Sequence, residues 1–114
     1  MTRLLWFLIA ALVVAATPSA SASEAAGTFA EFGLGGDVSG PLDITAGPDG
    51  NLWFTEYLNN RIGRITPSGA LTEFAVPTPE AFPADIALGA DGNVWFVETR
   101  GNNVGRITPI GAVT

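Results

Sequence analysis

The chain contains no cysteine and no histidine among its 114 residues. Without cysteine it forms no disulfide framework, no thiolate metal site and no lipid-anchored cysteine. Without histidine it lacks the commonest acid–base group near neutral pH and the commonest metal ligand. Positive charge is also scarce, with five Lys and Arg against eleven Asp and Glu. Because binding to phosphates needs clustered basic side chains, this balance argues against a nucleic-acid partner.

The only long apolar run stands near the N-terminus. Residues 4–16 form an uninterrupted stretch of 13 apolar residues behind Arg3, and a small-residue Ala-Ser-Ala sequence ends at Ala22. This layout is typical of a secretory signal peptide, and the run is shorter than the about 20 residues of a membrane-spanning helix. We therefore predict a signal peptide at 1–22, a flexible lead-in at 23–28, and a secreted or periplasmic product with no membrane association after cleavage.

The rest of the chain repeats itself at an offset of 42 residues. Residues 41–72 and 83–114 share 19 identities over 32 positions without a gap. Glu31-Phe32 also stands 42 residues before Glu73-Phe74, which indicates the tail of an earlier repeat. A fixed period of this length is the signature of a repeat architecture.

Each repeat consists of short strand-like runs separated by turn sequences. The runs are rich in β-branched and aromatic residues and cover 42–46, 51–56, 61–66 and 70–76 in the first repeat. Gly-Pro-Asp-Gly, Leu-Asn-Asn and Pro-Ser-Gly stand between them and favour turns. Run length, turn spacing and period together predict an all-β fold built from four-stranded antiparallel blades of a β-propeller.

At these residues the sequence resembles the virginiamycin B lyase (streptogramin B lyase) family of seven-bladed propellers, and more loosely the NHL-type repeats. The resemblance rests on GPDGNLWFTE at 47–56, RIGRITP at 61–67 and LTEF at 71–74. It implies a magnesium-dependent elimination that opens a cyclic depsipeptide antibiotic at its ester, carried out by His and Glu residues of later blades. Because this chain has no histidine, we predict that it holds no catalytic residue and no cofactor-binding residue of its own. Its metal ligands are left unknown.

We therefore expect residues 29–114 to form a partial propeller of about two blades. It would comprise the last strand of one blade, a full repeat at 41–82 and an incomplete repeat at 83–114. Two blades cannot close a ring, and ring closure is what hides strand edges and the apolar faces between blades. The expected partners are accordingly the missing blades or copies of the chain itself, besides an unidentified small-molecule ligand.

Three hypotheses about function follow. The first is an N-terminal fragment of an exported lyase-like propeller whose chemistry lies in further blades. The second is a fragment of a secreted, non-catalytic propeller that binds a ligand or a surface partner. The third is a short repeat protein that oligomerises into a closed ring.

Two Asp-Gly-Asn sequences, which begin at Asp49 and Asp91, are candidates for calcium loops. A calcium loop of the EF-hand type needs a Glu at its twelfth position, where this chain has Asn60 and Asn102. Because Asp-Gly between strands is itself a strong hairpin signal, we interpret both sequences as turns.

Glu56 and Glu98 recur at one repeat position, as do Arg64 and Arg106. The acids suggest a ring of carboxylates that lines a propeller channel and holds a cation. The alternative, which we favour, is that each Glu ends its strand at the surface beside the Arg of the next strand. An exposed pair of that kind contributes about 0–1 kcal/mol.

Trp53 and Trp95 stand at one register inside apolar strands, so we predict that they pack between blades and do not serve as carbohydrate-stacking platforms. Tyr57 and Arg100 lie in turn regions and differ from their repeat partners. Because loops carry the ligand contacts of rigid scaffolds, these two residues are the candidate ligand contacts.

Overall fold

The computed structural model describes residues 27–36 and 38–114, so the predicted signal peptide and residues 23–26 of the lead-in lie outside the described residues. The chain divides into two compact units, 1–31 and 32–114. Of the first unit only 27–31 are described, and these residues are exposed and form no strand. Within the described part of the chain, no helix is long and apolar enough to cross a membrane.

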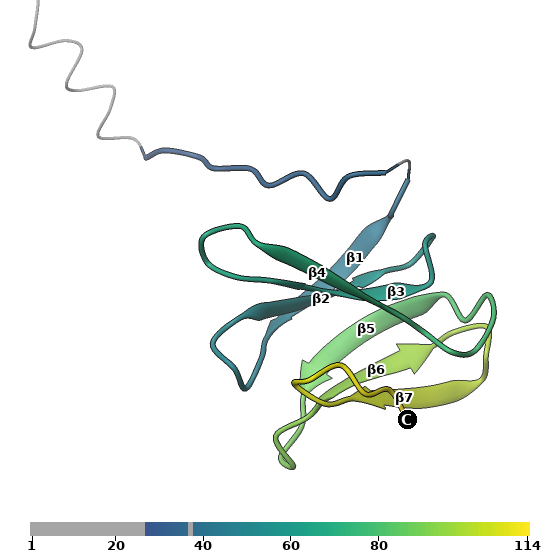
Figure 1. The fold of residues 1–114 in the computed structure, drawn as a ribbon. Coiled ribbons are helices and arrows are strands. Elements are labelled where there is room, and N and C mark those ends of the chain that lie inside the picture. The colour runs from purple at the N-terminus through teal and green to yellow at the C-terminus, as the bar shows by residue number, and fades with distance from the viewer. Residues whose placement is uncertain (1–26, 37) are drawn as a thin grey trace, which may run out of the picture. The chain divides into compact units, whose positions relative to one another are not determined.

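The second unit contains two antiparallel sheets whose strands follow one another in chain order (Figure 1). Blade 1 consists of β1 (Pro41–Ala46), β2 (Leu52–Glu56), β3 (Arg61–Ile65) and β4 (Leu71–Ala75). Blade 2 consists of β5 (Pro83–Leu88), β6 (Val94–Glu98) and β7 (Asn103–Ile107). The four strands of blade 1 begin and end within one residue of the bounds that the sequence predicts.

The glycines at Gly63 and Gly105 allow an aromatic ring to lie flat across the neighbouring strand. Phe54 stands opposite Gly63 in the β2–β3 ladder, and Phe96 stands opposite Gly105 in the β6–β7 ladder. A Cβ atom at either glycine would overlap the ring of its partner. The repeated glycines are therefore required by close packing within each blade.

The core lies between the two blades. The forward face of blade 1 (Trp53, Ile62, Phe74 and Val76) packs against the rear face of blade 2 (Ile86, Val94, Phe96 and Ile107). At about 25 cal/mol for each Å² of apolar surface removed from water, this contact is the main stabilising term of the pair.

Side chains also join the blades through hydrogen bonds. A β-bulge between Pro41 and Ile44 accompanies Asp43, whose Oδ2 accepts a hydrogen bond of 2.9 Å from the backbone N–H of Ile86. Arg64 donates from Nη1 to the carbonyl oxygen of Pro109 at 2.9 Å. These two bonds fix how far one blade can slide past the other.

Asn60 secures the connection between the blades. Its Nδ2 donates to the carbonyl oxygens of Val76 and Thr78, and its Oδ1 accepts from the backbone N–H of Ala81. Asn60 has φ of 54° and Asn102 has φ of 55°. Asn tolerates this left-handed region better than most residues, which explains why both turns end on Asn.

Residues 27–36 form no strand, so the predicted last strand of an earlier blade stays a prediction. Phe32 nevertheless occupies the repeat position of Phe74. A Cβ atom at Gly69 would meet the ring of Phe32, just as one at Gly111 would meet the ring of Phe74. The period of 42 residues therefore extends upstream into the packing as well as into the sequence.

Candidate functional site

The two Asp-Gly-Asn sequences form tight turns that also hold a tryptophan. Oδ1 of Asp49 accepts hydrogen bonds from the backbone N–H of Asn51 at 3.2 Å and from Nε1 of Trp53 at 2.9 Å. Asp91 accepts the same pair of bonds, including one of 2.9 Å from Nε1 of Trp95. These contacts confirm the interpretation of both sequences as turns.

The same contacts set the acidity of the two carboxyl groups. Partial burial acts to raise the pKa of Asp49, but hydrogen bonds from Trp53 and Asn51 more than offset it, so the pKa lies below its ordinary value. At Asp91, hydrogen bonds from Trp95 and Asn93 lower the pKa to about 2. Both aspartates are therefore charged at neutral pH and serve the turn.

The predicted surface pairs between Glu56 and Arg64, and between Glu98 and Arg106, are wrong. In the β2–β3 ladder Arg64 stands opposite Trp53, whereas Glu56 stands opposite Arg61. The Arg64 guanidinium lies 5.5 Å from the centroid of the Trp53 ring and 3.7 Å from Oδ2 of Asp49. Strand register thus places each repeated arginine at the far end of its hairpin from the repeated glutamate.

Arg106 repeats this arrangement in blade 2. Its guanidinium lies 5.5 Å from the centroid of Trp95 and 3.5 Å from Oδ2 of Asp91. Each repeated arginine therefore covers a tryptophan and contacts the turn aspartate, so it serves the blade.

Glu56 and Glu98 are buried, contrary to the prediction that they sit at the surface. Glu56 is 0% exposed, and neither of its carboxylate oxygens has a hydrogen-bond partner of good geometry. Burial raises the pKa of Glu56, although the nearby side chain of Ser39 opposes this shift. Glu98 is 5% exposed and accepts a hydrogen bond of 3.2 Å from Nδ2 of Asn103.

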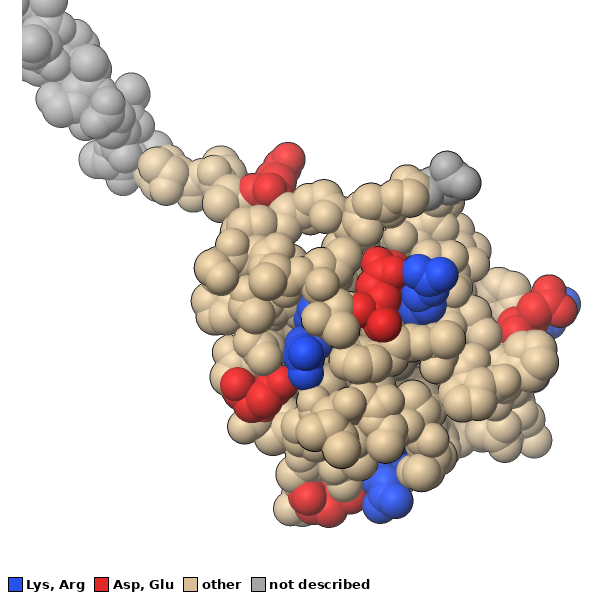
Figure 2. All heavy atoms as spheres, in the orientation of Figure 1, with Lys and Arg blue, Asp and Glu red and all other residues tan. Residues whose placement is uncertain are grey.

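The alternative of a cation site at these acids gains no support from the geometry. Among residues 27–36 and 38–114, no three His, Cys, Asp or Glu side chains gather in a way that could hold a metal ion. The described residues therefore do not fit the magnesium site that the resemblance implies. Figure 2 shows acidic and basic side chains next to one another at several places on one face, without an extended basic patch.

Trp53 is 0% exposed, which confirms its predicted packing between blades. Trp95 stands at the same register but is 37% exposed, because the forward face of blade 2 carries no neighbouring blade. Packing at one repeat position thus differs between the two copies.

Tyr57 and Arg100, the two predicted ligand contacts, meet on the ring of Phe82. The Tyr57 and Phe82 rings have centroids 4.9 Å apart and are inclined at 55°. The Arg100 guanidinium lies 5.1 Å from the centroid of Phe82. We call these three residues the loop cluster, since they come from the β2–β3, β4–β5 and β6–β7 connections.

Phe82 was missed in the sequence, although the repeat contains a signal for it. Its repeat partner is Gly40, which has φ of 61°, and Phe82 has φ of 51°. A side chain in this region costs about 1–2 kcal/mol, so glycine is the unstrained choice. Such strain concentrates at sites where the side chain is needed for packing or for function.

Beside the loop cluster lies a cleft of about 160 Å³. Its walls come from Tyr57, Phe82 and Glu80 together with the 58–60 turn. An apolar cavity of about 150 Å³ holds one benzene ring, so the cleft is large enough for a single planar group. The cluster supplies a phenol, an aromatic face and a guanidinium, which suit binding better than proton transfer.

Comparisons with known proteins agree with this architecture. The sequence matches the Virginiamycin B lyase family over residues 15–114. A solved streptogramin B lyase is 50% identical, with a TM-score of 0.76 over 79% of this chain and 30% of its own. Selenomethionine-substituted virginiamycin B lyase from Staphylococcus aureus is also 50% identical, with a TM-score of 0.77 over 78% of this chain and 30% of its own.

A third solved structure is a catalytically inactive histidine-to-alanine variant of the Staphylococcus aureus enzyme with quinupristin. It is 44% identical to this chain, with a TM-score of 0.75 over 78% of this chain and 30% of its own. These matches confirm the predicted propeller fragment. The chain spans about 30% of the length of the solved relatives that it matches.

Proposed function

Because the chain belongs to the virginiamycin B lyase family, we propose that it forms the N-terminal blades of an exported propeller of the streptogramin-lyase type. The apolar run and Ala-Ser-Ala sequence ahead of the repeats support export. The identity of 50% to a streptogramin B lyase supports the type of propeller. Reaction, substrate and magnesium dependence belong to the whole propeller in this proposal.

The absence of histidine from the 114 residues is the observation that assigns the chemistry elsewhere. Opening an ester ring by elimination needs a base for a proton α to a carbonyl and an acid for the leaving alkoxide. The one structural relative described as inactive has lost a histidine. In our proposal these blades supply the scaffold and the loop cluster, and the acid–base residues lie in other blades.

Activity measured with and without the remaining blades tests this division of roles. The exported chain is incubated with quinupristin and magnesium, and ring opening is followed by mass spectrometry. We expect no ring opening from the chain alone. We expect turnover when it is combined with the segment of the Staphylococcus aureus enzyme that follows the matched region, since that segment supplies the missing blades.

Two controls make the outcome decisive. The intact Staphylococcus aureus enzyme must open quinupristin under the same conditions, and its C-terminal segment must be tested alone. Turnover by the present chain that survives repurification and disappears in Glu56→Gln would make this chain an enzyme and overturn the proposal. N-terminal sequencing of the exported protein should begin at or near Ser23, and retention of Met1 would contradict export.

The second candidate function is a secreted, non-catalytic propeller that binds a ligand, and the loop cluster is the observation that favours it. Binding of quinupristin to the exported chain is measured by calorimetry, with Tyr57→Ala and Arg100→Ala as variants and Thr99→Ala as a control in the same loop. Binding that weakens at least tenfold in both variants, in the absence of any turnover by the combined blades, would favour this alternative over the lyase.

A further inference from the structure

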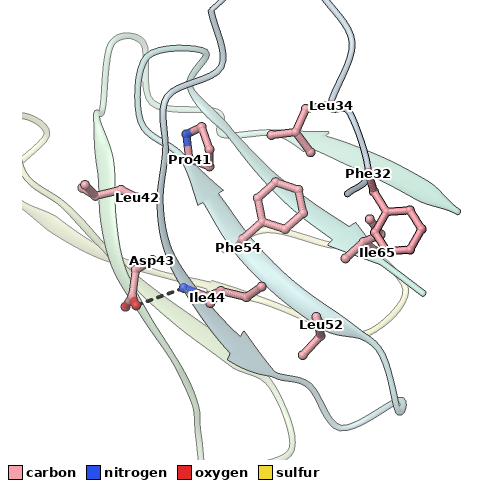
Figure 3. Close-up of a pocket in the computed structure, with 9 residues that line it drawn as sticks. All are labelled: Phe32, Leu34, Pro41, Leu42, Asp43, Ile44, Leu52, Phe54 and Ile65. Carbon is pink, nitrogen blue, oxygen red and sulfur yellow. Dashed lines mark hydrogen bonds between the residues drawn. The ribbon is translucent and has the colours of Figure 1, made fainter. Parts of the chain in front are cut away.

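Blade 1 carries an open apolar groove on its rear face, and Figure 3 shows the side chains that line it. Its volume is about 480 Å³. Ile44, Leu52, Phe54 and Ile65 line it from β1, β2 and β3, and Phe32 completes it from the segment before the sheet. An exposed apolar surface of this kind marks an interaction site.

The same surface exists a second time in the molecule, and there it is covered. Ile86, Val94, Phe96 and Ile107 are the repeat partners of the four groove residues and form the rear face of blade 2. Ile44 is 57% exposed, whereas Ile86, at the equivalent position, is 6% exposed. The difference arises because the forward face of blade 1 covers Ile86.

The covered copy shows what kind of surface fits the groove. The rear face of blade 2 is covered by a blade face with Trp53 and Ile62 at its centre. Their repeat partners, Trp95 and Val104, lie on the forward face of blade 2 and are both exposed. This chain therefore presents a groove at one end of the blade pair and a surface of the matching chemistry at the other.

We propose that the rear-face groove of one copy binds the forward face of blade 2 of a second copy, so that chains associate head to tail. Because the two surfaces differ, each copy still has one free surface after pairing. A contact of this heterologous type leads to a ring if the rotation closes and to an open filament if it does not.

Polar groups at the two surfaces support the same register. Asp43 accepts a hydrogen bond from the N–H of Ile86 across the existing interface. The equivalent pair in the proposed contact is Asp85 of the second copy with the N–H of Ile44. Asp85 is exposed, and the N–H of Ile44 at present donates to its own neighbour Asp43 at 2.9 Å (Figure 3).

Phe32 removes a gap that this contact would otherwise contain. In the covered copy, Phe74 of β4 lies over Gly111. The three strands of blade 2 present no phenylalanine at that repeat position, but Phe32 of the first copy already lies over Gly69. The groove therefore contains the side chain that the incoming blade lacks.

Two single variants block one surface each. Trp95→Glu places a charge on the forward face of blade 2, and Ile44→Glu places one in the groove. Ile110→Glu is the matched control, because Ile110 is 89% exposed and follows Pro109, which contacts blade 1. Molar mass is measured by light scattering on the exported chain over a hundredfold range of concentration.

We expect wild type and Ile110→Glu to associate as concentration rises, and each blocked variant to stay monomeric. An equimolar mixture of Trp95→Glu and Ile44→Glu should give a dimer and nothing larger, since each variant keeps the surface that the other has lost. This rescue also shows that both variants are folded, and Val104→Glu in place of Trp95→Glu should behave in the same way.

A wild-type chain that is monomeric at every concentration would overturn the proposal. Association that persists in either blocked variant, or a mixture that stays monomeric, would also contradict it. Because the measured quantity is molar mass, the result does not depend on export of a natural lyase or on activity toward quinupristin.

Discussion

The indole of Trp53 lies almost parallel to the ring of Phe74, with centroids 5.7 Å apart and planes inclined at 12°. Phe74 comes from the fourth strand of the same blade, and both rings lie in the apolar interface with blade 2. Trp95 has no such neighbour in the described part of the chain and is partly exposed. One sequence phrase, written twice, therefore has two different energetic weights.

Trp53→Ala should lower the free energy of unfolding by about 3–5 kcal/mol, the usual cost of deleting a buried large aromatic side chain. Trp95→Ala should cost less than half as much, because over a third of that side chain is already in water. Urea denaturation followed by circular dichroism measures both, at a concentration where light scattering shows monomer. Equal losses in the two variants would contradict the arrangement of faces described above.

Phe82→Gly should be more stable than Phe82→Ala by about 1 kcal/mol, although glycine usually destabilises a chain. Both variants lose the ring between Tyr57 and Arg100, so their difference reports the backbone alone. At a φ of 51° alanine keeps the strain of a side chain and glycine does not. The comparison is made by urea denaturation, and a more stable alanine variant would mean that φ is not positive.

The Asp91 carboxyl should titrate with a midpoint near pH 2, and the indole N–H signal of Trp95 should shift with the same midpoint. The ordinary pKa is 3.8 and the folded value is about 2. A lowered folded pKa means that the carboxylate's contribution to stability is present above about pH 4 and is lost as the pH falls toward 2. Two-dimensional NMR follows both groups, and Asp91→Asn should abolish the shift of the indole signal.

Glu56→Gln should remove a loss of stability that the wild-type chain shows as the pH rises. Burial raises the pKa of Glu56 above its ordinary value of 4.5, so the protonated form is favoured in the folded state. Its contribution is therefore complete below pH 4.5 and disappears as the pH rises through the folded pKa. Urea midpoints between pH 4 and pH 8 measure the effect.

Glu73→Gln is the control for this experiment, because Glu73 pairs with Arg61 near the surface. The control variant should keep the wild-type loss of stability with rising pH. If the profiles of wild type and Glu56→Gln run parallel, the carboxyl of Glu56 reaches water in solution.

The loop cluster shows where sequence reasoning stops. Tyr57 and Arg100 stand out in the sequence because they break the repeat, but nothing local indicates that both reach the same ring. Their contact depends on how blade 2 is set against blade 1. That arrangement in turn is fixed by packing between faces and by the Asp43 and Arg64 hydrogen bonds.

The sequence by itself determined the blades, since strand runs, turns and the 42-residue period are local patterns that one chain shows twice. Only the tertiary structure decided that Arg64 covers Trp53, that Glu56 is buried, and that one face of each blade stays open. Those outcomes depend on strand register and on which surfaces meet. Both are set by contacts between residues far apart in the chain, and a period, however regular, carries no record of them.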